Sequence, residues 1–310
     1  MGKLITIVVP TYNEELNVRN VHSRVTAVMK EHLSNYEYEL LFVDNCSLDD
    51  TREIIRGLSE EDSHVKAIFN ARNFGYVKNV FYAVSQAKGD CAFLLHADLQ
   101  NPPEMLVEFV KYWEEGYKVV VGVKKSSREN KLLFGFKKVY YKIMNKISDV
   151  EMIEQLTDYG LYDKNFVQVL RSLDDPVPYF KGIVSELGYH MKTVDFEQHD
   201  REKGKSFTNF FKSYDYAMLG LTTYTKMIRA ASWIGAILGV ICLVIAMITF
   251  LSKILGWQDF PTGIAAIGIG TFFIGAIQMF FLGILGEYVM CINTRMLHRP
   301  LVIEEERIRY

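Results

Sequence analysis

Two long runs without charged residues near the C-terminus restrict this chain more than any other sequence feature. Residues 230–252 and 260–286 contain no Asp, Glu, Lys or Arg, over 23 and 27 positions respectively. At ~1.5 Å of rise per residue, a helix over either run is longer than the ~30 Å apolar thickness of a bilayer. The alternative is a pair of buried helices in a soluble core, where uncharged runs of this length are rare. We therefore expect a hairpin of two transmembrane helices, at about 230–252 and 262–288.

Basic residues flank both expected helices and indicate the orientation of the hairpin. Lys226 and Arg229 precede the first helix, and Arg295 and Arg299 follow the second, whereas the connector 253–263 holds one Lys and one Asp. The positive-inside rule then places both chain ends in the cytoplasm and the connector outside. Two helices are too few for a transporter. We expect an enzyme held in the inner cell membrane as a multi-pass protein, with a cytoplasmic catalytic domain.

The composition argues against several other classes of protein. A net charge of −2 provides no chain-wide basic surface, so nucleic acid is not an expected partner. The 4 cysteines lie far apart and show neither a disulfide pattern nor a zinc pattern. Neither the Gly-rich dinucleotide fingerprint nor the P-loop motif is present. Any phosphate group must therefore be bound by a metal ion or by Lys and Arg side chains.

Residues 1 to about 120 alternate between short apolar runs and amphipathic segments. The runs predict strands at 5–9, 39–43, 65–69, 91–95 and 119–123, with helices at 15–31, 50–59, 77–87 and 103–115. Apolar strands separated by helices indicate a Rossmann-like α/β fold, with a mostly parallel sheet flanked by helices. Ligands of such sheets bind at the carboxyl ends of the strands. The loops at 10–15, 44–51, 70–75 and 96–103 are therefore expected to carry the chemistry.

These loops together resemble family-2 glycosyltransferases of the GT-A fold. They contain Val-Val-Pro-Thr-Tyr-Asn-Glu-Glu, Val-Asp-Asn-Cys-Ser-Leu-Asp-Asp-Thr, Ala-Arg-Asn-Phe-Gly and Ala-Asp-Leu-Gln-Asn-Pro-Pro, in this order. Farther along, Arg-Glu-Lys-Gly-Lys-Ser at 201–206, the two apolar runs, Gly-Glu-Tyr at 286–288 and Arg-Pro at 299–300 resemble the polyprenyl-phosphate branch of that family. Members of that branch resemble dolichyl-phosphate-mannose synthase and carry two transmembrane helices at the C-terminus.

The resemblance covers nearly the whole chain and implies a domain organisation. A cytoplasmic GT-A domain is expected at 1–206 and an interfacial juxtamembrane helix at 207–229. The two transmembrane helices would occupy 230–292, and a cytoplasmic tail would follow at 293–310.

The resemblance also implies a divalent metal, Mg²⁺ or Mn²⁺, after the fourth strand. Such a cation offsets the charge of a departing diphosphate and needs only one or two protein carboxylates. Asp98 fits this role with Gln100 beside it, and a helix cap is the alternative role for Asp98. The family usually has Asp-x-Asp here, whereas this chain has His96-Ala97-Asp98. His96 would be a third ligand that suits Mn²⁺ better than Mg²⁺.

The donor nucleotide is expected against the first loops. A carboxylate can accept the imide N–H of uracil, and by resemblance Asp44 makes this contact. Capping of the turn is the alternative role of Asp44 and is compatible with binding. The residues expected to bind the nucleotide sugar are Pro10, Tyr12, Glu14, Asp44, Arg72, Asn73, Ala97 and Asp98.

Two later segments are expected to act on the acceptor. By resemblance, Asp158 matches the family's Asp-Phe-Arg-Leu segment and is the candidate base, although Gly160 stands where that pattern has Arg. A phosphate monoester has its second pKa near ~6, so a polyprenyl phosphate is mostly dianionic at neutral pH. Positioning is therefore the alternative role of Asp158. By resemblance, Arg201, Lys205 and Ser206 bind the acceptor phosphate, and Arg201 also acts in catalysis because its guanidinium grips phosphate bidentately.

These patterns predict inverting transfer of a hexose or N-acetylhexosamine from a UDP-sugar to undecaprenyl phosphate at the inner leaflet. The β-linked product would serve cell-surface glycan modification, which requires a separate flippase and a downstream extracytoplasmic glycosyltransferase. Membrane lipid is a further expected partner, and homo-oligomerisation is left open. A processive synthase is disfavoured because the chain has no Gln-x-x-Arg-Trp segment. A non-processive transferase with a glycan or diacylglycerol acceptor and an inactive membrane scaffold both stay open.

Overall fold

The computed structural model of the chain describes residues 2–124, 156–198, 263–297 and 299–310, with isolated positions between 218 and 251. Arg201, Lys205 and Ser206 lie outside these residues. Most of the expected juxtamembrane helix and most of the first expected transmembrane helix do so too, and these elements therefore stay predictions.

A mixed 8-stranded sheet in the order β7-β5-β6-β4-β1-β2-β3-β8 forms the centre of the N-terminal domain. Parallel pairing joins β1 to β2 and β4, β2 to β3, and β5 to β7, whereas β6 and β8 run antiparallel to their neighbours. All five strands predicted from the sequence are confirmed, and β6, β7 and β8 were not predicted. The strands are β1 (Leu4–Thr11), β2 (Glu37–Asp44), β3 (Val65–Asn70), β4 (Cys91–Leu94), β5 (Val119–Lys124), β6 (Leu156–Asp163), β7 (Met191–Phe196) and β8 (Glu304–Ile308).

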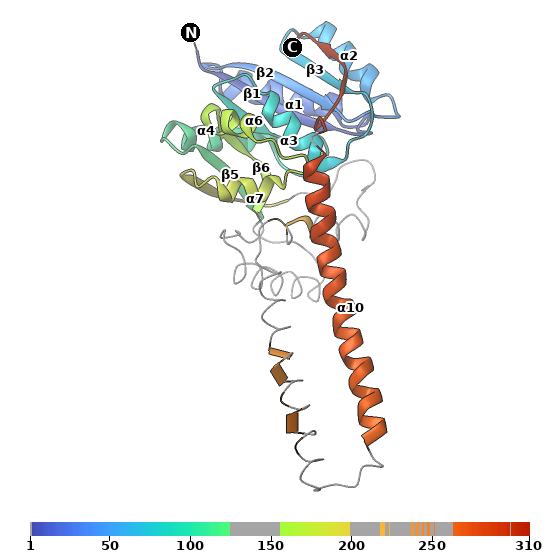
Figure 1. Cartoon of the computed structure of the whole chain (residues 1–310). Helices are drawn as coiled ribbons and strands as arrows, with labels where there is room; N and C mark the ends of the chain where they lie inside the picture. The colour runs from blue at the N-terminus through green and yellow to red at the C-terminus, as the bar shows by residue number, and fades with distance from the viewer. Residues whose placement is uncertain are drawn as a thin grey trace.

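Helices cover both faces of this sheet (Figure 1). The elements are α1 (Val18–His32), α2 (Thr51–Glu61), α3 (Tyr76–Gln86), the 3₁₀ helix η1 (Pro103–Met105), α4 (Leu106–Glu114), α6 (Lys164–Ser172) and α7 (Phe180–Glu186). Apolar residues of α1, α2 and α4 form one core cluster, and those of α3, α6 and α7 form a second. Alternate residues of a strand face opposite sides, so Phe42 joins the first cluster while Leu41 and Val43 join the second. The central strands are apolar on both faces for this reason.

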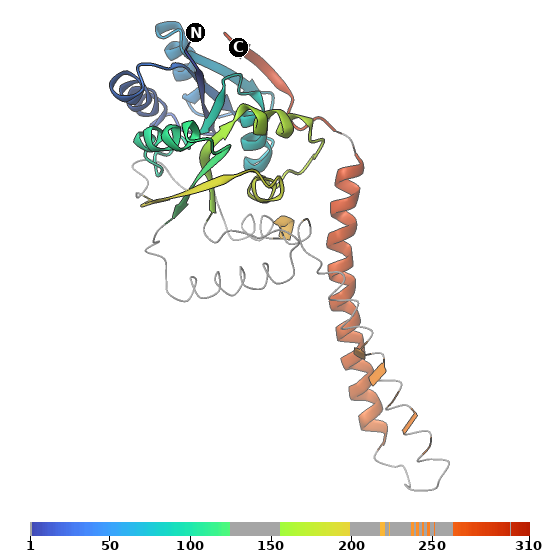
Figure 2. The same cartoon turned by 90° about the vertical axis from the view of Figure 1, so that its left-hand side faces the viewer.

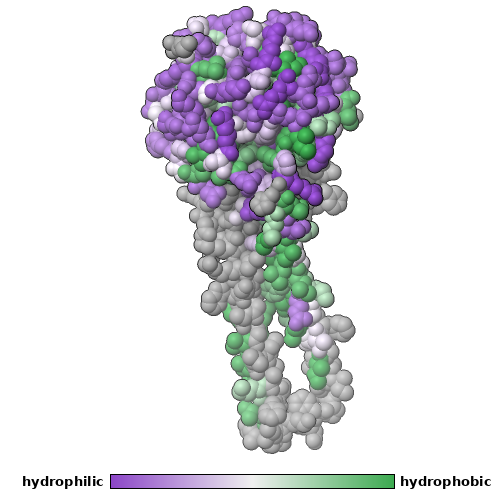
Figure 3. Space-filling model, turned by 45° about the horizontal axis from the view of Figure 1, so that its top comes forward, coloured by the Kyte–Doolittle hydropathy of each residue, from purple (hydrophilic) through white to green (hydrophobic). Residues whose placement is uncertain are grey.

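A single long helix, α10 (Gly263–Met296), leads away from the domain (Figures 1 and 2). Among the described residues, its segment Phe273–Met296 is the one stretch long and apolar enough to cross a membrane, judged by length and composition. Phe273, Met279 and Phe280 on this segment are more than 60% exposed. Figure 3 shows the contrast between this apolar stalk and the hydrophilic surface of the domain. The second expected transmembrane helix therefore has a helical counterpart, whereas the two-helix hairpin stays a prediction.

The chain returns to the sheet after α10. Residues expected to form a tail contribute β8, which pairs antiparallel with β3 at the edge of the sheet. Two ion pairs hold it there: Arg52 Nη1 lies 2.9 Å from Glu305 Oε2, and Arg56 Nη2 lies 2.6 Å from Glu306 Oε2. The strand covers backbone groups of β3 that would otherwise form an open edge.

An acid at the C-terminal end of α2 connects three elements. Asp62 Oδ2 lies 2.9 Å from His22 Nε2 of α1, and Asp62 Oδ1 lies 2.7 Å from His64 Nδ1 before β3. Burial by itself would raise the pKa of Asp62, but hydrogen bonds from both histidines and from the His64 backbone outweigh it and lower the pKa to about 2. The ionised form of Asp62 therefore stabilises the folded state.

We predict that Asp62→Asn lowers the free energy of unfolding by about 1–2 kcal/mol at neutral pH, after allowance for partial exposure. Because the folded-state pKa is depressed, the wild-type advantage should be complete above pH 3.8 and should shrink as the pH falls towards about 2. Thermal unfolding of the two proteins between pH 7 and pH ~2.5 measures this difference. Glu60→Gln, at an exposed position of α2, is the control and should show no such change. A difference that stays constant with pH would contradict the prediction.

Candidate active site

The loops at the carboxyl edge of the sheet contain left-handed backbone at residues other than glycine. Asn13 after β1 has φ 55°, Cys46 after β2 has φ 61°, and Leu99 after β4 has φ 56°. This conformation costs roughly 1–2 kcal/mol for a residue with a Cβ. Strained backbone of this kind gathers at functional sites, where the surrounding structure imposes it. Its presence after three strands singles out this edge as the candidate site.

Asp44, the predicted uracil contact, is fully buried at the end of β2. Its Oδ1 accepts hydrogen bonds from the hydroxyls of Ser47 and Thr11, while its Oδ2 accepts from the Ser47 N–H and from Arg52 Nε, at 2.9 Å in both cases. Arg52 also donates from Nη2 to the Asn70 carbonyl oxygen at 2.6 Å. Asp44 therefore organises the turn, and its contact with a nucleobase stays a prediction.

An asparagine network joins the loops after β2 and β3. Asn45 Nδ2 donates to Asn73 Oδ1 at 3.0 Å, and Asn45 Oδ1 accepts from the Phe74 N–H at 2.9 Å and from Asn70 Nδ2 at 3.3 Å. Asn73 Oδ1 also accepts from the N–H of Gly75, whose φ of 90° suits glycine. The network fixes the loop that carries the predicted donor residues Arg72 and Asn73.

The other predicted donor residues occupy the ends of β1 and β4. Pro10 lies within β1 opposite Val43, and Tyr12 follows the strand. Glu14 is 9% exposed; its Oε2 accepts from Asn17 Nδ2 at 2.6 Å and its N–H donates to Thr51 Oγ1, so it orders the start of α1. Ala97 is buried just after β4.

The antiparallel register of β4 and β6 brings His96 and Asp158 together. Cys91 pairs with Asp163 and Leu94 with Gly160, so two residues farther along His96 comes opposite Asp158. His96 Nε2 lies 3.1 Å from Asp158 Oδ1, and the Tyr76 hydroxyl donates to Asp158 Oδ2 at 2.5 Å. The Tyr76 and His96 rings stack with centroids 6.2 Å apart. The site thus joins β4, β6 and the start of α3.

This cluster stabilises the ionised form of a buried carboxylate. Burial would raise the pKa of Asp158, but the charge and hydrogen bond of His96, the charge of Lys181 and the hydrogen bond of Tyr76 together hold it well below its usual range. Burial lowers the pKa of His96, and Asp158 more than offsets this, so that the net shift is upward. A carboxylate with a depressed pKa and both oxygens occupied is a poor proton acceptor. The geometry favours the positioning role of Asp158 over the base.

Asp98 and Gln100 provide oxygen donors next to this cluster. Asp98 is half-buried; its Oδ1 accepts from the Gln100 N–H at 3.2 Å, and Gln100 Oε1 accepts from Gln198 Nε2 at 3.1 Å. Within the described ranges, no group of three or more His, Cys, Asp or Glu side chains is arranged to hold a metal ion. One carboxylate and one amide oxygen fit a hard divalent cation that takes its remaining ligands from substrate phosphates and water. The Nε2 atom of His96 is already engaged with Asp158.

Gly160 lies in the middle of β6, where no side chain fits. A Cβ atom there would come within 2.6 Å of the Val120 carbonyl oxygen and 2.9 Å of Val121 Cγ1. The Tyr162 hydroxyl lies 3.2 Å from that position and donates to the Asp158 carbonyl oxygen at 2.7 Å. The arginine expected here by resemblance would therefore not fit, because Val120, Val121 and Tyr162 fill the space beside Gly160.

Three residues near the site were missed in the sequence. Tyr76 directly follows the Ala-Arg-Asn-Phe-Gly segment, Arg52 directly follows the Asp-Asp-Thr segment, and Lys181 lies on α7. Tyr76 and Arg52 directly follow recognised motifs, and this position in the sequence could have indicated that they lie near the site. Lys181 gave none, because only the packing of α7 against β6 brings its charge near Asp158 and His96.

Comparison with known proteins identifies the fold and its relatives. Residues 6–169 match the model of glycosyl transferase family 2. The chain is 29% identical over 304 residues to a putative glycosyltransferase, CsbB, of Bacillus subtilis, covering 98% of this chain and 92% of the relative. It is also 29% identical over 315 residues to the bactoprenol glucosyl transferase of Shigella phage SfV, covering 98% and 99%. The crystal structure of mannosyl-3-phosphoglycerate synthase from Rubrobacter xylanophilus shares the fold, with a TM-score of 0.50 at 13% identity over 84% of this chain and 77% of that one.

We predict that Gly160→Ala lowers the free energy of unfolding by about 2–3 kcal/mol, because the added methyl group meets backbone and core atoms that cannot move away. Thermal unfolding measures the change. Gly57→Ala is the matched control, since its Cβ meets nothing within 4 Å and alanine favours the helix α2. The control should be neutral or slightly stabilising. A wild-type melting temperature for Gly160→Ala would show that the strand accommodates a side chain.

Proposed function

We propose that this chain, a glycosyltransferase that belongs to glycosyl transferase family 2, transfers a sugar from a UDP-sugar to a polyprenyl phosphate at the inner face of a membrane. The observation that carries the proposal is the position of Asp98, His96 and Asp158 at one carboxyl edge, in a domain that continues into a helix able to cross a bilayer. An active site and an anchor in one chain suit a water-soluble donor and a lipid acceptor. The similarity to a bactoprenol glucosyl transferase over nearly the full chain supports a polyprenyl phosphate as the acceptor.

The donor binds along the loops after β1, β2, β3 and β4. Buried Asp44 and the asparagine network keep these loops in place, so the pocket is formed before the donor arrives. Arg72, Asn73 and Tyr12 are the side chains proposed to contact the nucleotide. Asp98 and Gln100 would hold Mg²⁺ or Mn²⁺, and the cation when bound supplies charge compensation for the departing diphosphate.

The acceptor phosphate is already ionised at neutral pH, so the protein needs to position it rather than deprotonate it. Its oxygen attacks the anomeric carbon from the side opposite the diphosphate. The new C1–O bond forms as the bond to the diphosphate breaks, UDP leaves, and the configuration is inverted. Asp158, held by Tyr76 and His96, gives the acceptor side of the pocket a fixed shape. Arg201, Lys205 and Ser206 stay the proposed contacts of the acceptor phosphate.

The lipid-linked sugar then requires a separate flippase and an extracytoplasmic glycosyltransferase to reach a cell-surface glycan. We propose a cytoplasmic catalytic domain and two membrane-spanning helices, consistent with the charges that flank the apolar runs. A hexose or an N-acetylhexosamine is the proposed sugar.

The reaction itself is testable with purified full-length protein in detergent. Incubation with undecaprenyl phosphate, Mn²⁺ or Mg²⁺, and a panel of labelled UDP-sugars should yield one lipid-linked product that is labile to mild acid. The anomeric configuration, read by NMR, should be β for an α-linked donor. Label found only on a glycan or on diacylglycerol would contradict the acceptor. Absence of product with every donor would contradict the proposed function.

A substitution tests the proposed cation ligand. We predict that Asp98→Asn lowers kcat by about 100-fold or more, about 3 kcal/mol in barrier height, and weakens the dependence on Mn²⁺. Glu31→Gln, at an exposed position near the end of α1, removes one carboxylate elsewhere and should leave kcat unchanged. Unimpaired turnover by Asp98→Asn would overturn the assignment of the ligand.

A further inference from the structure

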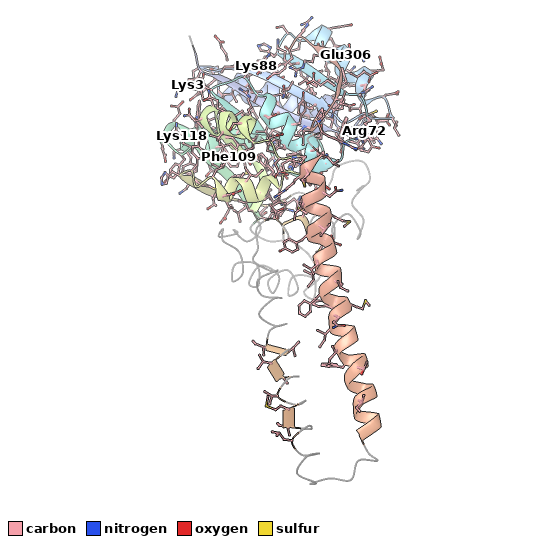
Figure 4. The ribbon with its side chains drawn as sticks, in the orientation of Figure 1. Lys3, Arg72, Lys88, Phe109, Lys118 and Glu306 are labelled. Atoms are coloured by element: carbon pink, nitrogen blue, oxygen red, sulfur yellow. The ribbon has the colours of Figure 1, made fainter. Side chains whose placement is uncertain are left out.

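Three cationic side chains from distant parts of the chain meet where α10 joins the domain. Arg72 lies in the loop after β3, Lys78 in the first turn of α3, and Arg299 three residues beyond the end of α10. The Ala71 N–H donates to the Ile303 carbonyl oxygen at 2.9 Å, and β8 pairs with β3, so the segment after α10 is fixed beside the loop of Arg72. Lys78 lies close enough to Arg72 and Arg299 for both charges to act on it. Figure 4 labels Arg72 on the side of the domain from which α10 leaves.

The cluster has no counter-charge in the part of the chain that the structure describes. No carboxylate there forms an ion pair with Lys78, Arg72 or Arg299. Burial, followed by the charges of Arg72 and then Arg299, lowers the pKa of Lys78. Arg72 stacks over the Phe74 ring, 4.2 Å from its centroid, and its Nη1 donates a hydrogen bond to the Asn73 carbonyl oxygen. A half-buried lysine held beside two arginines is unfavourable unless an anion shares the site.

The location of the cluster indicates the kind of anion. The apolar segment Phe273–Met296 ends three residues before Arg299. If this segment spans a bilayer, the cluster lies at the level of the lipid head groups, on the membrane surface that faces the domain. Figure 3 shows hydrophilic surface at the top of the apolar helix. Arginine and lysine bind phosphate oxygens through charge-assisted hydrogen bonds, and such clusters favour anionic lipids.

We propose that Arg72, Lys78 and Arg299 form a binding site for the phosphate of an anionic phospholipid head group, which holds the domain against the membrane surface. The inference rests on the proposed membrane placement of α10 but not on the transfer reaction. Its consequence is that the bilayer fixes the height of the loop after β3, and with it one wall of the active site.

Removal of one charge from this site should not lower the melting temperature of the lipid-free protein, because the three charges repel one another when no anion is bound. Lys78→Met keeps an unbranched side chain, one atom shorter, and removes one charge. In neutral detergent without phospholipid, this variant should melt at a temperature equal to or above that of the wild type. Added phosphatidylglycerol should raise the melting temperature of the wild type and have little effect on the variant. A residue with a merely structural role would lower the melting temperature under both conditions.

Native mass spectrometry of the full-length protein in neutral detergent measures binding directly. Titration with phosphatidylglycerol should show about 10-fold weaker binding for Lys78→Met and for Arg299→Met, and at least as large an effect for the double variant. Lys78→Arg should retain binding. Lys111→Met on α4, an exposed lysine on the opposite side of the domain from α10, is the control and should bind as the wild type does. Arg72 is not substituted, because it is also a proposed donor contact.

The outcomes separate this inference from the proposed function. Unchanged phosphatidylglycerol binding in the double variant would overturn the inference. Loss of undecaprenyl phosphate binding alone, with phosphatidylglycerol binding intact, would assign the cluster to the acceptor and also overturn it. A wild-type protein that yields no product with any UDP-sugar but binds phosphatidylglycerol through Lys78 and Arg299 would refute the transfer reaction and leave the lipid site standing.

Discussion

The insertion of antiparallel β6 between β4 and β5 is the constraint on which the candidate site depends. Parallel strands alone would bring the loops of β1, β2, β3 and β4 to one edge. β6 runs the other way, and its pairing with β4 sets Asp158 opposite His96 at that edge. The close packing of Gly160 against β5 leaves this register no freedom to slip, because a shift by one residue would reverse every side chain of a buried strand. Two residues more than 60 positions apart in sequence are thereby held in one ion pair.

Much of the polar edge is occupied by bonds within the protein itself. Asp44, Asn45 and Glu14 use their buried polar atoms to order turns, and three residues other than glycine hold left-handed backbone. Such a network must be nearly complete, because an unpaired polar group in the interior costs about 1–3 kcal/mol. The result is a set of loops whose conformation is held by contacts within the protein. His96 belongs to the same network of internal contacts, since its Nε2 lies 3.1 Å from Asp158 Oδ1.

The C-terminal strand links the long apolar helix α10 to the sheet. After α10 the chain runs through Arg299, contacts the loop after β3 through Ile303 and then adds β8 beside β3. Ion pairs join α2 to Glu305 and Glu306 of this strand. Arg52 is shared between Asp44 at the end of β2 and Glu305 in this strand. Arg52 therefore connects the turn around Asp44 to the strand that follows α10.

The sequence by itself determined the strands β1 to β5, the helices between them and the apolar segment of α10, because burial on both faces of a strand and around a helix leaves a local pattern. It also placed the motif-bearing loops at the carboxyl ends of β1, β2, β3 and β4, since the order of the motifs follows the order of these strands. Only the tertiary structure decided that Gly160 excludes an arginine, that Asp158 is clamped by His96 and Tyr76, and that the C-terminal residues complete the sheet. In β6, β7 and β8 polar and apolar residues are mixed, and whether such a segment forms a strand depends on the strands that pair with it. Contacts between residues far apart in sequence follow from strand pairing and registration, and no local pattern encodes these.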